Sequence, residues 1–249
     1  MELSSYVPGV IIHGHGQRDR MAYFKKLGIF VKTPRPGKVK TRLVPPLSAE
    51  EACDLYRAFL QDLFGRLDRL KKIDATVFYA GDDEGEMDGL VPKRFRIQRQ
   101  QGDNLGERLR SAFGHLLRQD NDMAVIIGSD SPDIPLVFLK RAWLKLKHKD
   151  VVLGPSSDGG YYLIGLKKAA DPLFNGVAWG GETVLEQTLA RIHEHDLAFS
   201  LLPLWYDVDN AHSLALLRSM VFARRIEHRD RLHNTERVLD ELNKRTPGV

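Results

Sequence analysis

VIIGSDSPDIP, residues 125–135, is the segment around which the other motifs of this chain can be arranged. Its β-branched start predicts a buried strand that stops at Gly128. Asp130 and Asp133 follow directly, and open α/β sheets bind ligands at the carboxyl ends of their strands. We therefore expect Asp130 to lie at a ligand-binding edge. Ser131 or Asp133 can instead cap the helix that follows, because hydroxyls and carboxylates suit helix starts.

Strand-like and helix-like segments alternate along the rest of the chain. The expected strands span residues 27–31, 75–79, 95–98, 123–127, 151–153, 161–166 and 198–202. Apolar residues at helical spacing predict helices over 48–70, 105–117, 137–146, 182–192, 213–221 and 235–242. This alternation predicts an α/β sandwich with a mostly parallel sheet. Cys53 lies in the first helix and is expected to be a small core residue.

The composition bounds the number of domains. The chain has 249 residues, of which 43% are hydrophobic, so residues 21–249 are expected to form a single domain. Residues 1–20 contain Gly, Pro and His and lack a core pattern, which predicts a flexible lead. Residues 224–245 are dense in charge of both signs, which predicts a solvated helical tail, or a cap on the core or on a partner.

Charge, cysteine count and hydropathy exclude several classes of protein. The net charge is only +4, from 37 basic and 33 acidic residues, so we expect no nucleic-acid partner. The single cysteine excludes an intrachain disulfide. No apolar run reaches the roughly 18 residues that a membrane span needs, and no secretory signal is expected. We expect a cytoplasmic protein, and no feature of the sequence specifies an oligomer.

Five cationic side chains follow the first expected strand within KTPRPGKVKTRL. They are Lys32, Arg35, Lys38, Lys40 and Arg42. Prolines and a glycine keep this segment out of regular structure, so the cations lie in a loop at a strand end. Such a loop suits phosphate binding, because arginine offers a fork of donors and lysine a compact charge. A solvated basic loop is the alternative. The segment is neither a P-loop nor a GxGxxG loop.

GPSSDGG, residues 154–160, separates two expected strands. Gly159 and Gly160 follow Asp158, and glycine permits a positive φ or the close approach of a ligand. The same residues are typical of a hairpin turn. The sequence of this segment is compatible with either role.

Asp207 and Asp209 lie two residues apart in DVDN, after the last expected strand. In an extended segment both point the same way, so both can face one cation, or one can bind it while the other holds the loop. Carboxylate oxygens suit Mg²⁺ or Mn²⁺, and magnesium commonly keeps water and substrate phosphates as further ligands. Asp130 and Asp209 would suffice for such a site. Capping of the helix near Ser213 is the alternative.

Two further motifs combine glycine with helix-start residues. QGDNLGERL contains Gly102 and Asn104, which can bring backbone amides and a side-chain amide near a ligand. WGGET contains Glu182 and Thr183 at an expected helix start. Both motifs also fit ordinary helix-start chemistry.

The chain resembles the DUF2064 family through six motifs that occur in order. They are KTPRPGKVKTRL, QGDNLGERL, GSDSPDIP, GPSSDGGYYLIGL, WGGETVL and DVDN, over residues 27–217. Members are also described as selenodomain-associated transferase 1 or glycosyltransferase-like proteins. The resemblance implies the nucleotide-diphospho-sugar transferase superfamily and its Rossmann-like GT-A fold, a three-layer α/β/α sandwich. More distantly, residues 40–43 are similar to the KSRL-type motif of 2-phospholactate guanylyltransferases.

The resemblance also implies roles for individual residues. Asp130 and Asp209 match the positions of metal-binding acids. Lys32, Lys40 and Arg42 match the basic loop that faces the phosphates. The segment reads GSDSP instead of a clean DxD, and the GxGxR loop of sugar nucleotidyltransferases is absent. The choice between glycosyl and nucleotidyl transfer therefore stays open.

Motifs and resemblance together predict a metal-dependent transferase that uses a nucleotide or nucleotide-sugar and a small-molecule acceptor. Glycosyl transfer from an NDP-sugar is the main interpretation, with Asp130 and Asp158 as the catalytic residues, Asp158 to orient the acceptor or to act as a base. The nucleotide side is expected to include Lys32, Arg35, Lys40, Arg42, Gly102 and Asn104, and the acceptor side Gly159, Gly160, Glu182 and Thr183. The alternatives are a nucleotidyltransferase that releases pyrophosphate and a non-catalytic nucleotide-binding module.

Overall fold

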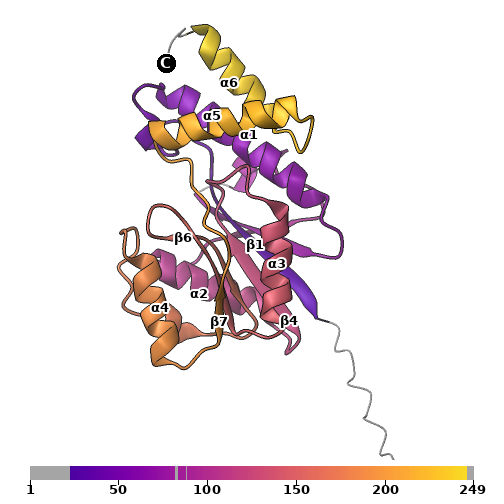
Figure 1. Ribbon diagram of the computed structural model, residues 1–249, viewed down its shortest axis with the longest axis vertical. Helices are drawn as coiled ribbons and strands as arrows, with labels where there is room; N and C mark the ends of the chain where they lie inside the picture. Colours follow the sequence, from indigo (N-terminus) through magenta and orange to yellow (C-terminus); the bar gives the residue numbers. More distant parts are fainter. Residues whose placement is uncertain (1–22, 82–83, 88, 246–249) are drawn as a thin grey trace, which may run out of the picture.

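A computed structural model describes residues 23–81, 84–87 and 89–245 of the chain. The lead expected at residues 1–20 lies outside these ranges. The described residues form a seven-stranded sheet with helices on both faces (Figure 1). None of the described helices combines the length and the apolar character that a membrane crossing requires.

The sheet has the strand order β3-β2-β1-β4-β6-β5-β7. Its strands are β1 (Phe24–Lys32), β2 (Asp74–Ala80), β3 (Arg96–Arg99), β4 (Asp122–Ile127), β5 (Val151–Pro155), β6 (Tyr161–Leu166) and β7 (Phe199–Leu201). Neighbouring strands of this described sheet are parallel except where β6 meets β4 and β5. The mostly parallel sheet expected from the sequence is therefore confirmed.

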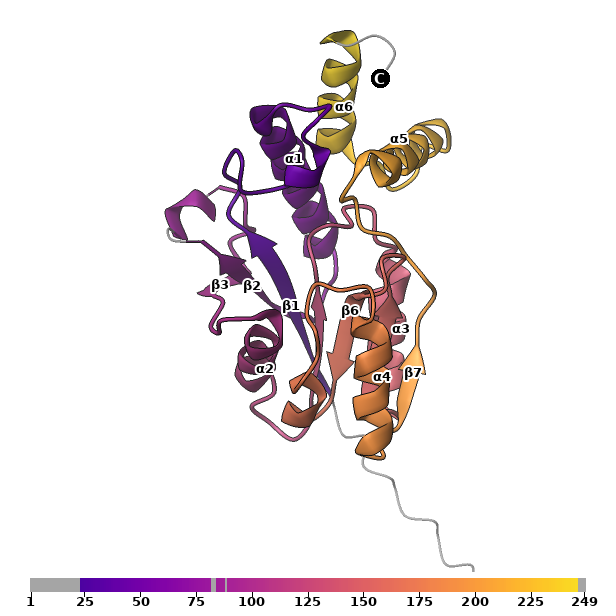
Figure 2. The same ribbon diagram turned by 90° about the vertical axis from the view of Figure 1, so that its left-hand side faces the viewer.

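Helices cover both faces of the sheet and complete three layers. The described helices are α1 (Ala49–Asp68), α2 (Leu105–Leu116), α3 (Leu136–Leu146), α4 (Val184–Glu194), α5 (Ala211–Ile226) and α6 (His233–Arg245). Short 3-10 helices lie in the connections: η1 (Thr41–Leu43), η2 (Glu84–Met87) and η3 (Asp171–Phe174). α1 and α3 pack on one face, and α2 and α4 on the other (Figure 2). The α/β/α sandwich is thus confirmed.

β4 lies at the centre of this arrangement, and all of its residues are buried. Met123, Val125 and Ile127 belong to the core on the side of α1 and α3, whereas Ala124 and Ile126 belong to the core on the side of α2. A strand that is buried on both faces has a continuous apolar sequence, which is the pattern seen here. The loop after β4 therefore starts from a rigid support.

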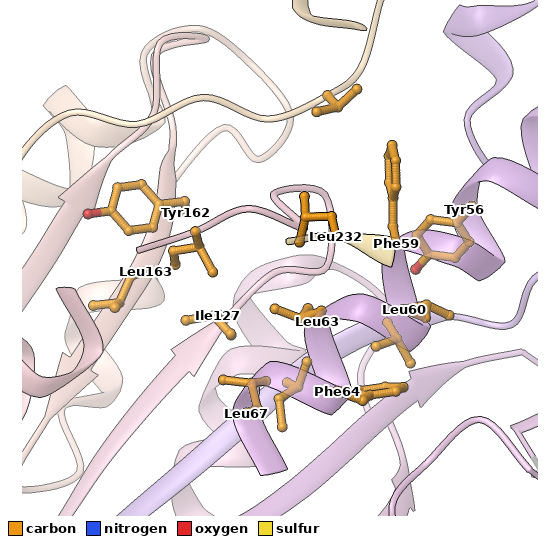
Figure 3. Close-up of a cluster of buried hydrophobic side chains, with 14 of the residues drawn as sticks. Tyr56, Phe59, Leu60, Leu63, Phe64, Leu67, Ile127, Tyr162, Leu163 and Leu232 are labelled. Atoms are coloured by element: carbon orange, nitrogen blue, oxygen red, sulfur yellow. The ribbon is translucent and has the colours of Figure 1, made fainter. Parts of the chain in front are cut away.

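The C-terminal helix packs against α1. Figure 3 shows Phe59 of α1 in the same buried cluster as Leu232, the residue before α6. The Asp62 carboxylate of α1 accepts hydrogen bonds from the backbone amides of Asn234 at 3.1 Å and Thr235 at 2.7 Å. Because these amides belong to the first turn of α6, Asp62 satisfies groups that a helix start leaves unpaired. Residues 233–245 thus cap the domain at α1.

Arg66 joins α1, the loop after β4 and the α5–α6 connection. Its side chain is 1% exposed and contacts both carboxylate oxygens of Asp230, at 3.1 and 2.6 Å. It also donates to the carbonyls of Pro132 at 2.8 Å and Ile134 at 2.9 Å. Desolvation alone would raise the pKa of Asp230, but hydrogen bonds and attraction from Arg66 and Arg224 lower it overall. The guanidinium therefore fixes the course of this loop.

Candidate active site

The motif-bearing loops leave the sheet at one edge. β1 to β4 are parallel, and β5 and β7 run in the same direction because both β4 and β5 are antiparallel to β6. The segments after β1, β3, β4, β5 and β7 carry KTPRPGKVKTRL, QGDNLGERL, GSDSPDIP, GPSSDGG and DVDN respectively. All of them therefore start at the carboxyl edge, where open α/β sheets bind their ligands.

Asp130 and Asp209 come together because their segments are hydrogen-bonded to each other. The Val208 amide donates to the Asp130 carbonyl at 2.9 Å. Lys40 lies between the two carboxylates, with Nζ at 2.5 Å from Oδ1 of Asp130 and 3.3 Å from Oδ1 of Asp209. The same ammonium donates to the Val208 carbonyl at 2.7 Å. Lys40 thus contacts one aspartate from each of two other motifs.

Lys40 is the buried member of this group. Its side chain is 3% exposed, whereas those of Asp130 and Asp209 are 45% and 34% exposed. The backbone at Lys40 has a φ of 49°, in the left-handed region, and the rings of Tyr56 and Phe59 lie near the ammonium. Desolvation would lower the pKa of Lys40, but the two carboxylates raise it overall, so the group stays charged. Lys40 lies behind the carboxylates, and its direct contact with phosphate stays a prediction.

The other cations expected to bind phosphate lie on the outside of the loop. Arg42 is 75% exposed, and its guanidinium is 4.0 Å from the Asp209 carboxylate. The Lys32 side chain is also exposed. Arg35 pairs with Glu86 of η2 at 2.5 Å. Arg42 and Lys32 can therefore reach a ligand from solvent, whereas Arg35 is engaged with an acid.

Ser131 and Asp133 hold the loop after β4 and do not cap α3, whose N-cap is Pro135. Asp133 is fully buried and accepts hydrogen bonds from the Tyr206 hydroxyl at 2.7 Å and the Trp205 indole at 3.4 Å. The Ser131 hydroxyl lies 2.8 Å from the Tyr206 carbonyl oxygen. The capping interpretation of both residues is wrong, because this loop packs against the segment after β7 before α3 begins.

Asp207 and Asp209 have different surroundings. The Asp207 carboxylate accepts hydrogen bonds from the hydroxyls of Ser131 at 2.6 Å and Ser156 at 2.9 Å, which ties three loops together. Burial raises the pKa of Asp207 to about 6, and nearby carboxylates contribute. Asn210, and neither aspartate, is the N-cap of α5. One acid of DVDN therefore holds the loops while the other faces Lys40.

The DGG segment forms the turn between β5 and β6. Asp158 is exposed, and its carboxylate accepts a hydrogen bond from the Gly160 amide at 3.0 Å. Gly159 has a φ of 87°, and its carbonyl accepts a hydrogen bond from the Leu185 amide at 2.9 Å. A Cβ at Gly159 would lie 1.9 Å from the carbonyl oxygen of Glu182, whose side chain is exposed. The hairpin turn is confirmed, and it places Asp158 beside the WGGET loop.

The expected helix-start residues take part in local structure. Asn104 is the N-cap of α2 and accepts a hydrogen bond from the Glu107 amide at 3.0 Å. Gly102 has a φ of 127°, and a Cβ there would lie 2.5 Å from that of Glu107. Thr183 is the N-cap of α4, and its hydroxyl accepts from the Gln187 side chain at 2.7 Å. Ligand contacts by these residues stay predictions.

Trp179 and Tyr56 lie in this region, although neither is among the residues predicted for the site from the sequence. The Trp179 indole packs on Gly106 of α2, where a Cβ would lie 2.4 Å from Nε1, and this contact joins WGGET to QGDNLGERL. The Tyr56 hydroxyl is 2.7 Å from the Ser129 hydroxyl, just before Asp130. The two glycines after Trp179 are a sequence feature from which a loop near the site could have been predicted. Tyr56 has no such feature beside it, because it lies on the apolar face of α1.

Asp130 and Asp209 fit the donor chemistry of a divalent cation. Both carboxylates converge on one positive charge, and both are partly exposed. Among the described residues, no group of three or more His, Cys, Asp or Glu side chains is arranged to hold a metal ion. Mg²⁺ is commonly held by one or two carboxylates, with water and phosphate oxygens completing its shell. The site therefore fits a cation shared with a phosphorylated substrate.

Comparisons with known proteins identify a matching family and a similar solved structure. A family model described as "Uncharacterized protein conserved in bacteria (DUF2064)" matches residues 63–181. A "putative nucleotide-diphospho-sugar transferase" from Desulfovibrio desulfuricans G20 is 34% identical to this chain. Its crystal structure aligns with 90% of this chain and 96% of its own, with a TM-score of 0.79. The curated proteins contain no match.

Two more distant solved structures show the fold. A 4-diphosphocytidyl-2C-methyl-D-erythritol synthase from Anaerococcus prevotii DSM 20548 is 10% identical, with 79% of this chain and 96% of that chain aligned and a TM-score of 0.52. A CMP:2-keto-3-deoxy-manno-octonic acid synthetase complexed with CTP is 11% identical, with 80% and 99% aligned and a TM-score of 0.50.

Proposed function

This chain belongs to the DUF2064 family, and on that basis we propose that it is a metal-dependent glycosyltransferase that uses an NDP-sugar and a small-molecule acceptor. The observation that supports this best is the contact of Asp130, Lys40 and Asp209 at the carboxyl edge of the sheet. A cation site without a complete protein shell suits a substrate that brings its own phosphate oxygens. The exposed Arg42 beside it offers a fork of donors for a diphosphate.

Transfer at this site would depend on positioning and on charge stabilisation. Mg²⁺ or Mn²⁺, bound by Asp130 and Asp209, would neutralise part of the charge that develops on the leaving diphosphate. Lys32, the last residue of β1, and Arg42, in the loop that follows, would bind phosphate oxygens and orient the leaving group. Asp158 would accept a hydrogen bond from an acceptor hydroxyl and, as a general base, take its proton as the new bond forms.

Product analysis tests the reaction. A thermal-shift screen of nucleotides and nucleotide-sugars with Mg²⁺ first identifies the donor, since a ligand at 100 times its Kd adds about 2.7 kcal/mol of stability. We then expect free NDP to appear when the donor is incubated with a panel of hydroxyl acceptors. Pyrophosphate release from an NTP would instead identify a nucleotidyltransferase. Binding without turnover across the panel would identify a binding module.

Metal and nucleotide are expected to bind cooperatively through Asp130 and Asp209. In wild type, we expect Mg²⁺ to strengthen nucleotide binding by about 1–3 kcal/mol relative to chelator. Asp130→Asn and Asp209→Asn each keep the size of the side chain but remove a charge, so both variants should fold and lose most of this coupling. Calorimetric titration with and without Mg²⁺ measures it.

Asp158→Asn is the matched control, because Asp158 is exposed at the same edge and belongs to a different loop. It should keep the full coupling between Mg²⁺ and nucleotide. If wild type binds nucleotide equally well with Mg²⁺ and with chelator, or if both Asp130→Asn and Asp209→Asn keep the coupling, the proposed metal site is wrong.

A further inference from the structure

The Lys40 ammonium lies where the two carboxylates of the proposed metal site converge. It is 2.5 Å from Asp130 and 3.3 Å from Asp209, and each contact involves Oδ1 of the aspartate. Lys40, Asp130 and Asp209 by themselves carry one net negative charge, and Arg42, 4.0 Å from the outer oxygen of Asp209, is largely exposed to solvent, which screens its charge. The chain therefore supplies its own cation to the pair of acids.

The ammonium approaches the carboxylates from the protein interior. Its side chain is almost completely buried, whereas both aspartates are partly exposed. A hydrogen bond to the Val208 carbonyl and the rings of Tyr56 and Phe59, at 5.9 and 5.7 Å, hold the ammonium on this inner side. A metal ion that arrives from solvent would meet the outer oxygens of the same carboxylates. The ammonium would then lie close behind it.

We propose that Lys40 is a positioning residue that makes divalent-cation binding depend on the nucleotide. A divalent ion bound without a nucleotide would change the net charge of these three residues from negative to positive. The ion would also lie close to the buried ammonium, and the two positive charges would repel each other. The phosphates of a nucleotide restore a negative balance. Lys40 thus holds the carboxylates together before the substrate arrives and disfavours the metal until it does. This inference rests on the proposed function, because it concerns the same site.

Titration with Mn²⁺ alone, followed by electron paramagnetic resonance, tests this role. Lys40→Met removes the charge, and we expect it to bind Mn²⁺ at least about tenfold more tightly than wild type in the absence of nucleotide. Lys38→Met is the matched control, since Lys38 is an exposed lysine of the same loop, and it should bind Mn²⁺ like wild type. Adding Asp130→Asn to Lys40→Met should abolish the gain, which locates the ion.

Lys40→Gln provides a second neutral variant that keeps a donor for the Val208 carbonyl. Circular dichroism identifies the variants that fold, and a gain in Mn²⁺ affinity is a result that a merely structural role would not produce. Unchanged or weaker Mn²⁺ binding in the folded Lys40 variants overturns the inference, even if wild type transfers sugar. A gain in Mn²⁺ affinity supports it, even if no NDP-sugar is turned over and the proposed reaction fails.

Discussion

Asp130, Asp133, Asp207 and Asp209 all follow strand ends, but they face different partners. Asp133 accepts a hydrogen bond from Tyr206, and Asp207 accepts hydrogen bonds from two serine hydroxyls, so both hold loops together. Asp130 and Asp209 face Lys40 and solvent. Sequence patterns predict acids at the sheet edge, because hydrophobicity reveals where a strand stops. They do not distinguish the four roles, which depend on the pairing of segments far apart in the chain.

The burial of Lys40 was also beyond prediction from the sequence. Lys38 and Arg42 lie two residues away on either side and are exposed, and nothing in composition separates the three. The difference arises from the left-handed backbone at Lys40, just before η1, and from contacts with α1 and the segment after β7. These contacts depend on tertiary structure alone.

Arg42→Ala is expected to weaken nucleotide binding about fivefold to tenfold, because it removes a donor from the phosphates at a solvent-exposed site. The melting temperature should stay unchanged, since the side chain is largely exposed. Calorimetric titrations at low and high salt measure the effect, which should shrink as salt rises. Arg141→Ala, an exposed arginine of α3, is the control and should bind like wild type. Wild-type affinity in Arg42→Ala would remove this residue from the site.

Most helices and strands could be predicted because each carries its own periodicity. α5 is longer than expected, Ala211–Ile226 against residues 213–221, because Arg224 and Arg225 end the apolar pattern while the helical hydrogen bonds continue. The reversed direction of β6 was not predicted from the pattern of the strand itself. A buried strand has the same apolar pattern in either direction, so the pattern does not indicate the direction of the strand. The turn motif at Asp158 was the sequence feature that indicated that β6 runs antiparallel to β5.

The connection between α1 and α5–α6 is expected to depend on pH through Asp230. Asp230→Asn should lower the free energy of unfolding by about 2 kcal/mol at pH 7, because it leaves the buried Arg66 without its anionic partner. The folded-state pKa of Asp230 lies below its ordinary value of 3.8. The stabilisation is therefore complete well above pH 3.8 and is lost as the pH falls through the lowered pKa.

Urea denaturation of wild type and Asp230→Asn at pH 7 and below pH 3 measures this effect. The two proteins should differ at pH 7 and converge in acid. Asp68→Asn is the control, because the Asp68–Arg94 pair is far more exposed, and it should change stability by less than about 1 kcal/mol. A difference between wild type and Asp230→Asn that is equally large at both pH values would show that the charge of Asp230 is unimportant.

The alternation of elements along the chain predicted the architecture of the molecule, since each strand and helix has a buried face that needs the next layer. Every buried core residue of the described structure lies at or after Leu27. We therefore propose that residues 21–249 are sufficient for the fold and for ligand binding. The order of the strands and the docking of α6 on α1 could not be predicted, because neither leaves a local pattern.

Deleting residues 1–20 should leave the melting temperature within about 2 °C of wild type, because the described core and the candidate site lie outside this segment. Nucleotide affinity should also be unchanged. Differential scanning fluorimetry of the full and shortened chains, with and without the nucleotide, measures both quantities. A loss of more than about 5 °C would show that this segment packs on the domain.

The pairing of Arg66 with Asp230 has a consequence for the order of events during synthesis. The two residues are 164 positions apart, and a chain emerges from the ribosome with its N-terminus first. Helix α1 is therefore complete long before the anion that neutralises its buried guanidinium exists. A polypeptide that stops before residue 230 carries an Arg66 that is costly to bury. In such an unfinished chain the apolar face of α1 that packs against α6 would also stay exposed to solvent. Exposed apolar surface is what chaperones bind, so this face would stay accessible to them until α6 has been synthesised and has packed on it.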